Sequence, residues 1–152
     1  MNHAEHYEMR LPYLRLLKNA HEKEASPDMP FLVIGPKSPV SWRKAVESMA
    51  YYFRREMHFD FPPYGVTETD FSPELGRDRV LVFPKTTVIE GFLDVCYFIG
   101  AVGVRWREWT DAPASWCVTW AWLHPYERRQ GHLTKAWPFL LRTFPNTWVE
   151  PH

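Results

Sequence analysis

The hydrophobic pattern of the first part of the chain is mainly helical. Leu11, Leu14 and Leu17 recur at helical spacing, which predicts a helix over residues 4–23, although a proline lies inside it. Residues 31–34 form a short apolar run between a proline and a Gly-Pro pair. This run predicts a strand, because strands are short and are bounded by such residues.

A second helix is predicted from Ser41, as its N-cap, to about His58, with apolar residues gathered on one side. The charged run Arg54-Arg55-Glu56 within it is interpreted as a solvated helix face. Residues 59–76 are rich in proline, glycine and aspartate, which predicts a loop.

The pattern then becomes strand-like. Residues 79–83 predict a strand that Pro84 stops, and residues 91–106 form a long apolar segment of high β-propensity. Residues 116–124 predict another strand, and the polar connection 108–115 suits a hairpin-like turn.

Strict alternation along residues 116–124 predicts two unequal faces. The bulky face would carry Trp116, Val118, Trp120, Trp122 and His124. The smoother face, on which a helix can lie, would carry Cys117, Thr119, Ala121 and Leu123. A helix over residues 132–143 and a short strand over residues 146–149 complete the pattern.

This order of elements predicts an α/β fold in which helices flank a mixed, mostly antiparallel sheet. The length of 152 residues corresponds to one domain, with a helical part over residues 1–60 and a sheet over residues 79–149. A hydrophobic content of 45% supplies enough apolar material for its core.

Composition narrows the classes of function. Eighteen basic residues balance eighteen acidic ones, which argues against a broad nucleic-acid footprint. The N-terminus has no apolar signal region and no run is long enough to span a membrane, so we expect a cytoplasmic chain without a membrane partner.

His3 and His6 lack recognisable further ligands, so no metal site is predicted. Cys96 and Cys117 lie in apolar runs, which favours reduced core thiols over a disulfide or a nucleophile.

Charged and flexible residues gather just before the last helix. Arg128 and Arg129 precede Gly131, and Thr134 falls in the first helical turn. The first N–H groups of a helix lack intrahelical partners and attract anions, and a glycine lets the backbone approach a ligand closely. These features favour a phosphate-binding cradle over the alternative, a solvated helix start with ordinary surface arginines.

The segment Arg128-Arg129-Gln130-Gly131-His132-Leu133 resembles the Arg/Gln-x-x-Gly-x-Gly/Ala acetyl-CoA-binding signature of the GNAT N-acyltransferase superfamily, which it matches at the first and fourth positions. The runs YFIGAVGVRW and WCVTWAWLHP look like the third and fourth strands of that family. The resemblance covers about residues 79–149.

The resemblance implies that acetyl-CoA is a co-substrate and that an amine attacks its thioester directly. The amides of residues 129–134 would wrap the pyrophosphate, and the pantetheine arm would run beside Trp122 and Leu123, in a gap between the fourth and fifth strands. The implied cofactor-binding residues are Trp122, Leu123, Arg128, Arg129, Gln130, Gly131, His132, Leu133 and Thr134.

Two residues are candidates for catalysis. His124, at the end of the fourth strand, is a candidate base or substrate contact, and Tyr126 a candidate acid; a hydrogen-bonded strand-end histidine and a packing tyrosine are the alternatives. Trp116, Trp120 and Trp122 either line an acceptor pocket or belong to the core.

The chain departs from the family pattern in three places. Leu133 stands where the family has a small residue, Pro138 lies inside the helix, and the chain ends at His152, where the family continues. A catalytically inactive binding or CoA-sensing module therefore stays an alternative. So does a fold completed by another chain, as in a homodimer. The sequence leaves the amine acceptor, small molecule or protein, unidentified.

Overall fold

The computed structural model describes residues 13–15, 30–65, 77–87 and 95–149. Its strands are β1 (Tyr13–Arg15), β2 (Leu32–Ile34), β3 (Asp78–Thr87), β4 (Val95–Arg107), β5 (Ser115–Leu123) and β6 (Trp148–Val149). Its helices are α2 (Val40–Met57), the short 3-10 helix η3 (Pro125–Glu127) and α4 (His132–Thr143).

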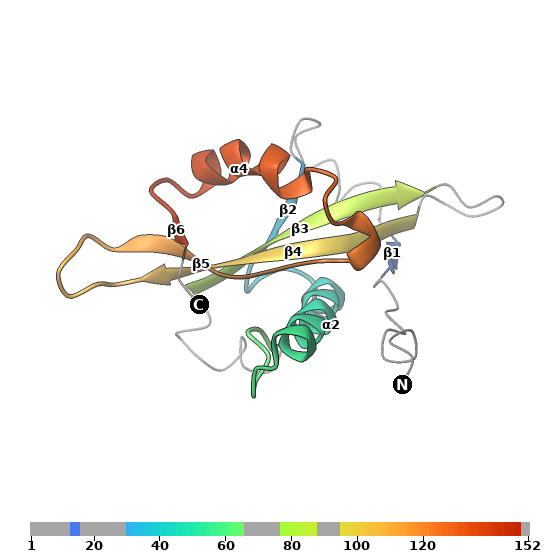
Figure 1. Ribbon diagram of the computed structural model, residues 1–152, viewed down its shortest axis with the longest axis horizontal. Helices are drawn as coiled ribbons and strands as arrows, with labels where there is room; N and C mark the ends of the chain where they lie inside the picture. Colours follow the sequence, from blue (N-terminus) through green and yellow to red (C-terminus); the bar gives the residue numbers. More distant parts are fainter. Residues whose placement is uncertain (1–12, 16–29, 66–76, 88–94, 150–152) are drawn as a thin grey trace.

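The strands form a mixed sheet in the order β2-β3-β4-β5-β6, and β1 also pairs with β4. The described pairs are antiparallel except β5 and β6, which run parallel. Helices α2 and α4 lie on opposite sides of this sheet (Figure 1). The prediction of an α/β fold with a mixed, mostly antiparallel sheet between helices is therefore confirmed.

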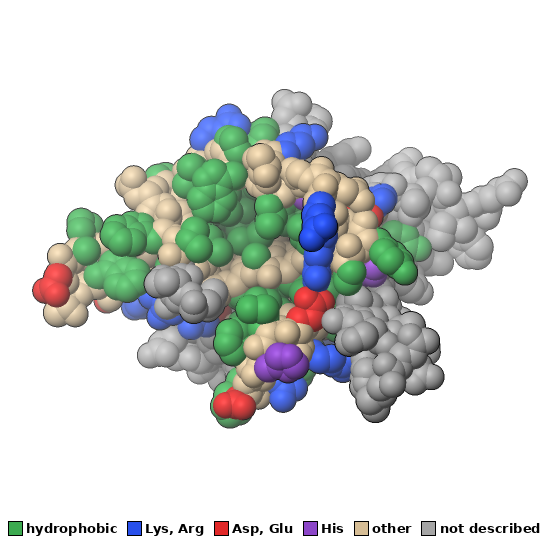
Figure 2. All heavy atoms as spheres, in the orientation of Figure 1, with side chains coloured by type: hydrophobic (Ala, Val, Ile, Leu, Met, Phe, Trp, Pro, Cys, Tyr) green, Lys and Arg blue, Asp and Glu red, His purple; other side chains and the backbone are tan. Residues whose placement is uncertain are grey.

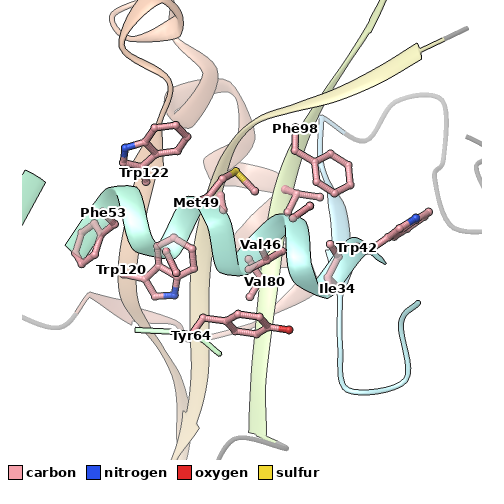
Figure 3. Packing of buried hydrophobic residues seen from close by; sticks show 14 of the residues in the cluster. Ile34, Trp42, Val46, Met49, Phe53, Tyr64, Val80, Phe98, Trp120 and Trp122 are labelled. Carbon is pink, nitrogen blue, oxygen red and sulfur yellow. The ribbon is translucent and has the colours of Figure 1, made fainter. Parts of the chain in front are cut away.

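Helix α2 covers one face of the sheet and buries the larger part of the core (Figure 3). Val46, Met49 and Phe53 recur at helical spacing and point toward the sheet. They pack with Val80 and Trp120, and each large buried side chain stabilises the fold by about 1.5–3 kcal/mol.

The start of α2 differs from the prediction. Pro39, not Ser41, is the N-cap, and no described side chain caps the helix. Pro39 takes a φ of −52°. Its ring fixes that angle near the helical value, which fits the start of a helix without a capping hydroxyl. The nearby Ser38 hydroxyl instead accepts a hydrogen bond from the Gly35 N–H at 3.0 Å.

Helix α4 covers the other face. Ala136 and Leu140 are buried against an apolar cluster that includes Leu81, Phe83 and Val102 from β3 and β4. The observed bounds, His132–Thr143, match the predicted helix. Pro138 lies on the exposed side, and the helix continues past it for five more residues, up to Thr143.

The predicted faces of β5 are wrong, because the strand contains a β-bulge. Trp120 pairs with Gly103, yet the next pair toward the start of β5 joins Val118 to Val104, so Thr119 is an extra residue. The bulge reverses the alternation. Trp116 and Val118 pack with the α4 cluster, whereas Trp120 and Trp122 pack with the α2 cluster.

Two further predictions are wrong, and in both cases pairing with β4 is the reason. Strand β3 continues through Pro84 to Thr87, and its register shifts between Phe83 and Pro84, a site that tolerates a residue without an N–H. Residues 13–15 form a strand rather than part of a helix, because they pair with β4 and such pairing overrides local propensity. The rest of the predicted helix over residues 4–23 lies outside the described residues.

The positions of two further elements are confirmed. Strand β2 and the connection between β4 and β5 lie where the pattern placed them. Cys117 is buried, while the side chain of Cys96 lies outside the described residues, as do His3 and His6. Within the described ranges, no helix is long and apolar enough to cross a membrane.

Candidate functional site

Strand β5 has two unlike halves along its outer edge. Its first half pairs in parallel with β6, through Cys117 with Trp148 and Val118 with Val149. From residue 119 to residue 123, β4 is the only described strand that pairs with β5. We call residues 119–123 the open edge of β5. Backbone N–H and C=O groups on such an edge can pair with a ligand, except where a side chain already bonds them, as Arg128 does at the Leu123 carbonyl.

A groove of about 320 Å³ lies beside this open edge. Three segments line it: the last turn of α2, the end of β5, and the turn that leads into α4. The lining residues are Phe53, Glu56, Met57, Ala121, Trp122, Leu123, Arg128, Arg129 and Leu133. We call it the β5–α4 groove. In the region between α4 and α2, Figure 2 shows basic side chains directly beside an acidic one.

Glu56 and Arg128 face each other in this groove. The Arg128 Nη2 atom donates to both Glu56 carboxylate oxygens at 2.8 Å, and Arg128 Nε donates to the Leu123 carbonyl at 2.8 Å. The Trp122 indole N–H also donates to Glu56 Oε1, at 3.1 Å. The pair therefore ties α2 to the end of β5, and the arginine lies against the open edge.

Sequence reasoning missed Glu56. The interpretation of residues 54–56 as a solvated helix face is wrong for this residue, whose side chain is only 18% exposed. A signal was present, because Met49, Phe53 and Glu56 recur at helical spacing and so share the buried side of α2. A charge at the end of an apolar stripe predicts a buried partner.

The turn between η3 and α4 has a special backbone. Arg129 and Gly131 have positive φ values of 62° and 80°. A Cβ at Gly131 would meet no atom within 4 Å, so the backbone conformation rather than space favours glycine. No described side chain caps α4, and its first N–H groups therefore stay available to an anion. The Gln130 side chain supports the turn by donating to the Tyr126 carbonyl at 2.8 Å.

The remaining predicted cofactor residues divide into two groups. Leu133 lines the groove, and Thr134 is exposed in the first turn of α4. His132 is instead linked to Glu127 at 3.2 Å, and Glu127 forms an ion pair with Lys85 of β3 at 2.7 Å. The hydrogen bond from Lys85 lowers the pKa of Glu127, with help from His132. This network joins the turn to β3, away from the groove lining.

No family model matches this sequence, and no curated protein matches it. The open edge of β5, the turn before α4 and the residues that line the groove are therefore the features that bear on function. Among the described residues, no group of three or more His, Cys, Asp or Glu side chains forms a candidate metal site.

The two candidate catalytic residues lie beside the groove rather than in its lining. His124 Nδ1 accepts a hydrogen bond from the Tyr126 backbone N–H at 3.1 Å, so the neutral ring carries its proton on Nε2. Burial lowers the pKa of His124. The positive charge of Arg128 lowers this pKa further, whereas the negative charge of Glu127 raises it. Tyr126 is 86% exposed, and its ring lies 5.3 Å from that of His124.

The three tryptophans of β5 do not line one pocket. Trp122 borders the groove, and Trp120 is buried beneath α2. Trp116 lies on the other face, with its ring 4.8 Å from that of Phe144. The core interpretation therefore holds for Trp116 and Trp120, and only Trp122 stays a candidate for ligand contact.

Proposed function

We propose that this chain is a GNAT-like domain that binds acetyl-CoA in the β5–α4 groove and transfers the acetyl group to an amine. The observation that carries the proposal is the open edge of β5, which lies beside a groove with Arg128 and Arg129 at the turn into α4. An extended arm can pair with the strand edge while its phosphates meet the turn.

The turn suits the diphosphate. Gly131 and Arg129 adopt left-handed backbone conformations, and α4 starts without a capping side chain among the described residues. Arg129 is exposed and adds a positive charge. Arg128 is held on one side by Glu56 and the Leu123 carbonyl, which orients its guanidinium before a ligand arrives. Backbone donors and a fixed guanidinium are the groups that proteins use to bind phosphate.

The reaction would be a direct transfer. The lone pair of a neutral amine attacks the thioester carbonyl carbon, a C–N bond forms, and the C–S bond breaks with its electrons on sulfur. The amine nitrogen loses a proton and the thiolate gains one. His124 and Tyr126 stay the candidate base and acid. His124 is largely neutral at pH 7, because burial lowers its pKa, so Nε2 cannot accept a proton unless the ring changes tautomer.

The alternative is a binding or CoA-sensing module without catalysis. It is favoured by one observation, that neither His124 nor Tyr126 lines the groove. Binding of acetyl-CoA without consumption of the thioester, across a panel of amines, would select this alternative over transfer.

Thermal unfolding with and without acetyl-CoA tests the site. We expect acetyl-CoA to raise the melting temperature, and Gly131→Glu to abolish this rise, because a carboxylate at the turn repels the diphosphate. Ala112→Glu is the matched control, since it adds the same charge on the exposed β4–β5 connection. The rise over each variant's own baseline is the quantity to compare, because Gly131→Glu also strains a residue with positive φ. No rise for the unchanged protein at millimolar acetyl-CoA would contradict the proposal.

A further inference from the structure

A second pocket lies at the opposite end of β5 from the β5–α4 groove (Figure 1). Its volume is about 430 Å³, which is within the range of ligand pockets, roughly 300–1,000 Å³. Two segments line it, the β4–β5 connection and β6, with the residues Trp109, Thr110, Asp111, Ala112 and Trp148. We call it the tryptophan pocket. The proposed transfer reaction does not use it.

Both tryptophans of this pocket are fixed to the fold although solvent reaches them. Trp109 is 39% and Trp148 63% exposed, whereas tryptophan is highly buried on average. The Trp109 indole N–H donates to the hydroxyl of the buried Ser115 at 2.9 Å, and the backbone of Trp148 is held by the pairing of β6 with β5. Because its N–H already has a partner, the Trp109 ring offers a ligand mainly its π face.

The spacing of the two rings suits a cation. Their centroids are 6.5 Å apart, and their planes are inclined by 36°. A cation is attracted to an aromatic face within about 6 Å of the ring centroid, and tryptophan attracts it more strongly than the other aromatic residues do. One cation can therefore lie within this distance of both centroids.

The charge of the lining also suits a cation. Among the five described lining residues, Asp111 is the only charged one, and its carboxylate attracts a positive group. Arg107, two residues before Trp109 in the sequence, lines a different pocket. The positive charge in the tryptophan pocket would therefore come from the ligand.

The rings also select the form of the cation. A primary ammonium carries three N–H groups, which lose hydrogen bonds to water when they enter an apolar site. A quaternary ammonium has no N–H, and its methyl groups pack against indole rings while its charge interacts with their π faces. We propose that the tryptophan pocket binds a small, free quaternary ammonium compound of the choline type. The nitrogen of such a ligand has no lone pair and cannot accept an acetyl group, so this site is distinct from that of the amine acceptor.

NMR titration of the full chain with choline tests the proposal, with the tryptophan indole N–H resonances as the signal. The comparison ligand is 3,3-dimethylbutan-1-ol, which has the same shape with a neutral carbon in place of the nitrogen. We expect choline to bind at least about fivefold more tightly, because two rings attract the charge. Trp148→Leu should remove most of this preference. Trp137→Leu is the matched control, since it replaces a partly exposed tryptophan of α4 outside the pocket and should preserve the preference.

The inference is overturned by equal affinity for choline and its neutral analogue, by an unchanged preference in Trp148→Leu, or by loss of the preference in Trp137→Leu. The comparison of the two ligands needs no variant, so it decides the matter even where Trp148→Leu fails to fold. Retention of the chain on phosphatidylcholine vesicles without binding of free choline would assign the pocket to a lipid head group and would overturn the assignment to a free ligand.

Thermal unfolding with acetyl-CoA separates this inference from the proposed function. Trp148 lies outside the lining of the β5–α4 groove, so Trp148→Leu should keep the full rise in melting temperature. A preference for choline without any rise by acetyl-CoA in the unchanged protein would contradict the proposed function alone. A rise by acetyl-CoA without a preference for choline would overturn the tryptophan pocket alone.

Discussion

The Asp78–Arg105 and Glu56–Arg128 pairs are both carboxylate–arginine pairs, yet the same chemistry has different consequences in each. Asp78 and Arg105 occupy opposed positions on β3 and β4, and Arg105 donates to the two carboxylate oxygens at 2.6 and 3.0 Å. Glu56 and Arg128 are 72 residues apart and join a helix to a turn. The first pair fastens neighbouring strands, whereas the second borders a groove.

The two pairs also differ in how far their side chains are exposed to solvent. The Asp78 side chain is 7% exposed, and burial raises the pKa of Asp78, although Arg105 acts in the opposite direction. The Arg128 side chain is 40% exposed, so a ligand can reach it. Location rather than residue type therefore separates a pair that serves the fold from one that is available for binding.

The largest effect is expected from Asp78→Ala. The substitution leaves the partly buried Arg105 without its carboxylate, and breaking a buried pair in this way costs about 3 kcal/mol of the free energy of unfolding. Urea denaturation measures this loss. Arg77→Ala is the control, because the Arg77–Glu108 pair is exposed with its atoms 3.6 Å apart. A loss in Asp78→Ala no larger than in the control would contradict the structural role of the first pair.

A smaller loss is expected from Glu56→Ala. It removes hydrogen bonds from Trp122 and Arg128, but water can reach the half-exposed arginine, so we expect a loss of about 1.5 kcal/mol. The same urea experiment gives the value. If Glu56→Ala proved as costly as Asp78→Ala, the contrast between the two pairs would disappear.

Lys85 and Glu127 form a third ion pair, which we expect to contribute less to the free energy of unfolding than the other two. Lys85→Ala removes the exposed partner of Glu127, which stays linked to His132, and should cost less than about 1 kcal/mol. Because the folded pKa of Glu127 lies below its ordinary value of 4.5, this stabilisation is present above pH 4.5 and is lost as the pH falls through the folded pKa. Thermal unfolding of the wild type and Glu127→Gln should therefore converge in acid. Curves that stay apart there would contradict this prediction.

The smallest effect concerns His124. Burial lowers its folded pKa below 6.5, so on acidification the unfolded chain takes up this proton first. The stability of the wild type should therefore fall, relative to His124→Asn, as the pH decreases below 6.5. Melting temperatures across this window measure the difference. A difference that does not change with pH would mean that His124 titrates alike in both states.

The sequence was informative where the structure depends on neighbours along the chain. Helix α4 and strand β2 follow from local periodicity, and the turn before α4 follows from Arg128, Arg129 and Gly131. The local pattern also selected Arg128, Arg129 and Leu133 as candidate cofactor-binding residues, and these three line the groove. These features depend on spacings of a few residues, which a single sequence displays directly.

Features that depend on distant partners could not be predicted. Glu56 becomes part of the groove only because Trp122 and Arg128, 66 and 72 residues later, fold against it. Strand β3 passes through Pro84 because the register against β4 shifts there. The helical spacing of Glu56 indicates that it shares the buried side of α2, but the local pattern identifies neither its partners nor the register shift, because both are set by tertiary contacts.

The β-bulge at Thr119 makes the effect of losing a residue from β5 depend on which residue is lost. Deleting Thr119 would remove the extra residue and leave Val118 and Trp120 as neighbours on opposite faces, so Trp120 and Trp122 would stay beneath α2. Deleting Ala121 would keep the bulge and send Trp122 toward α4, away from that core. In the natural variation of this gene, loss of the codon for Thr119 should therefore be far better tolerated than loss of the codon for Ala121.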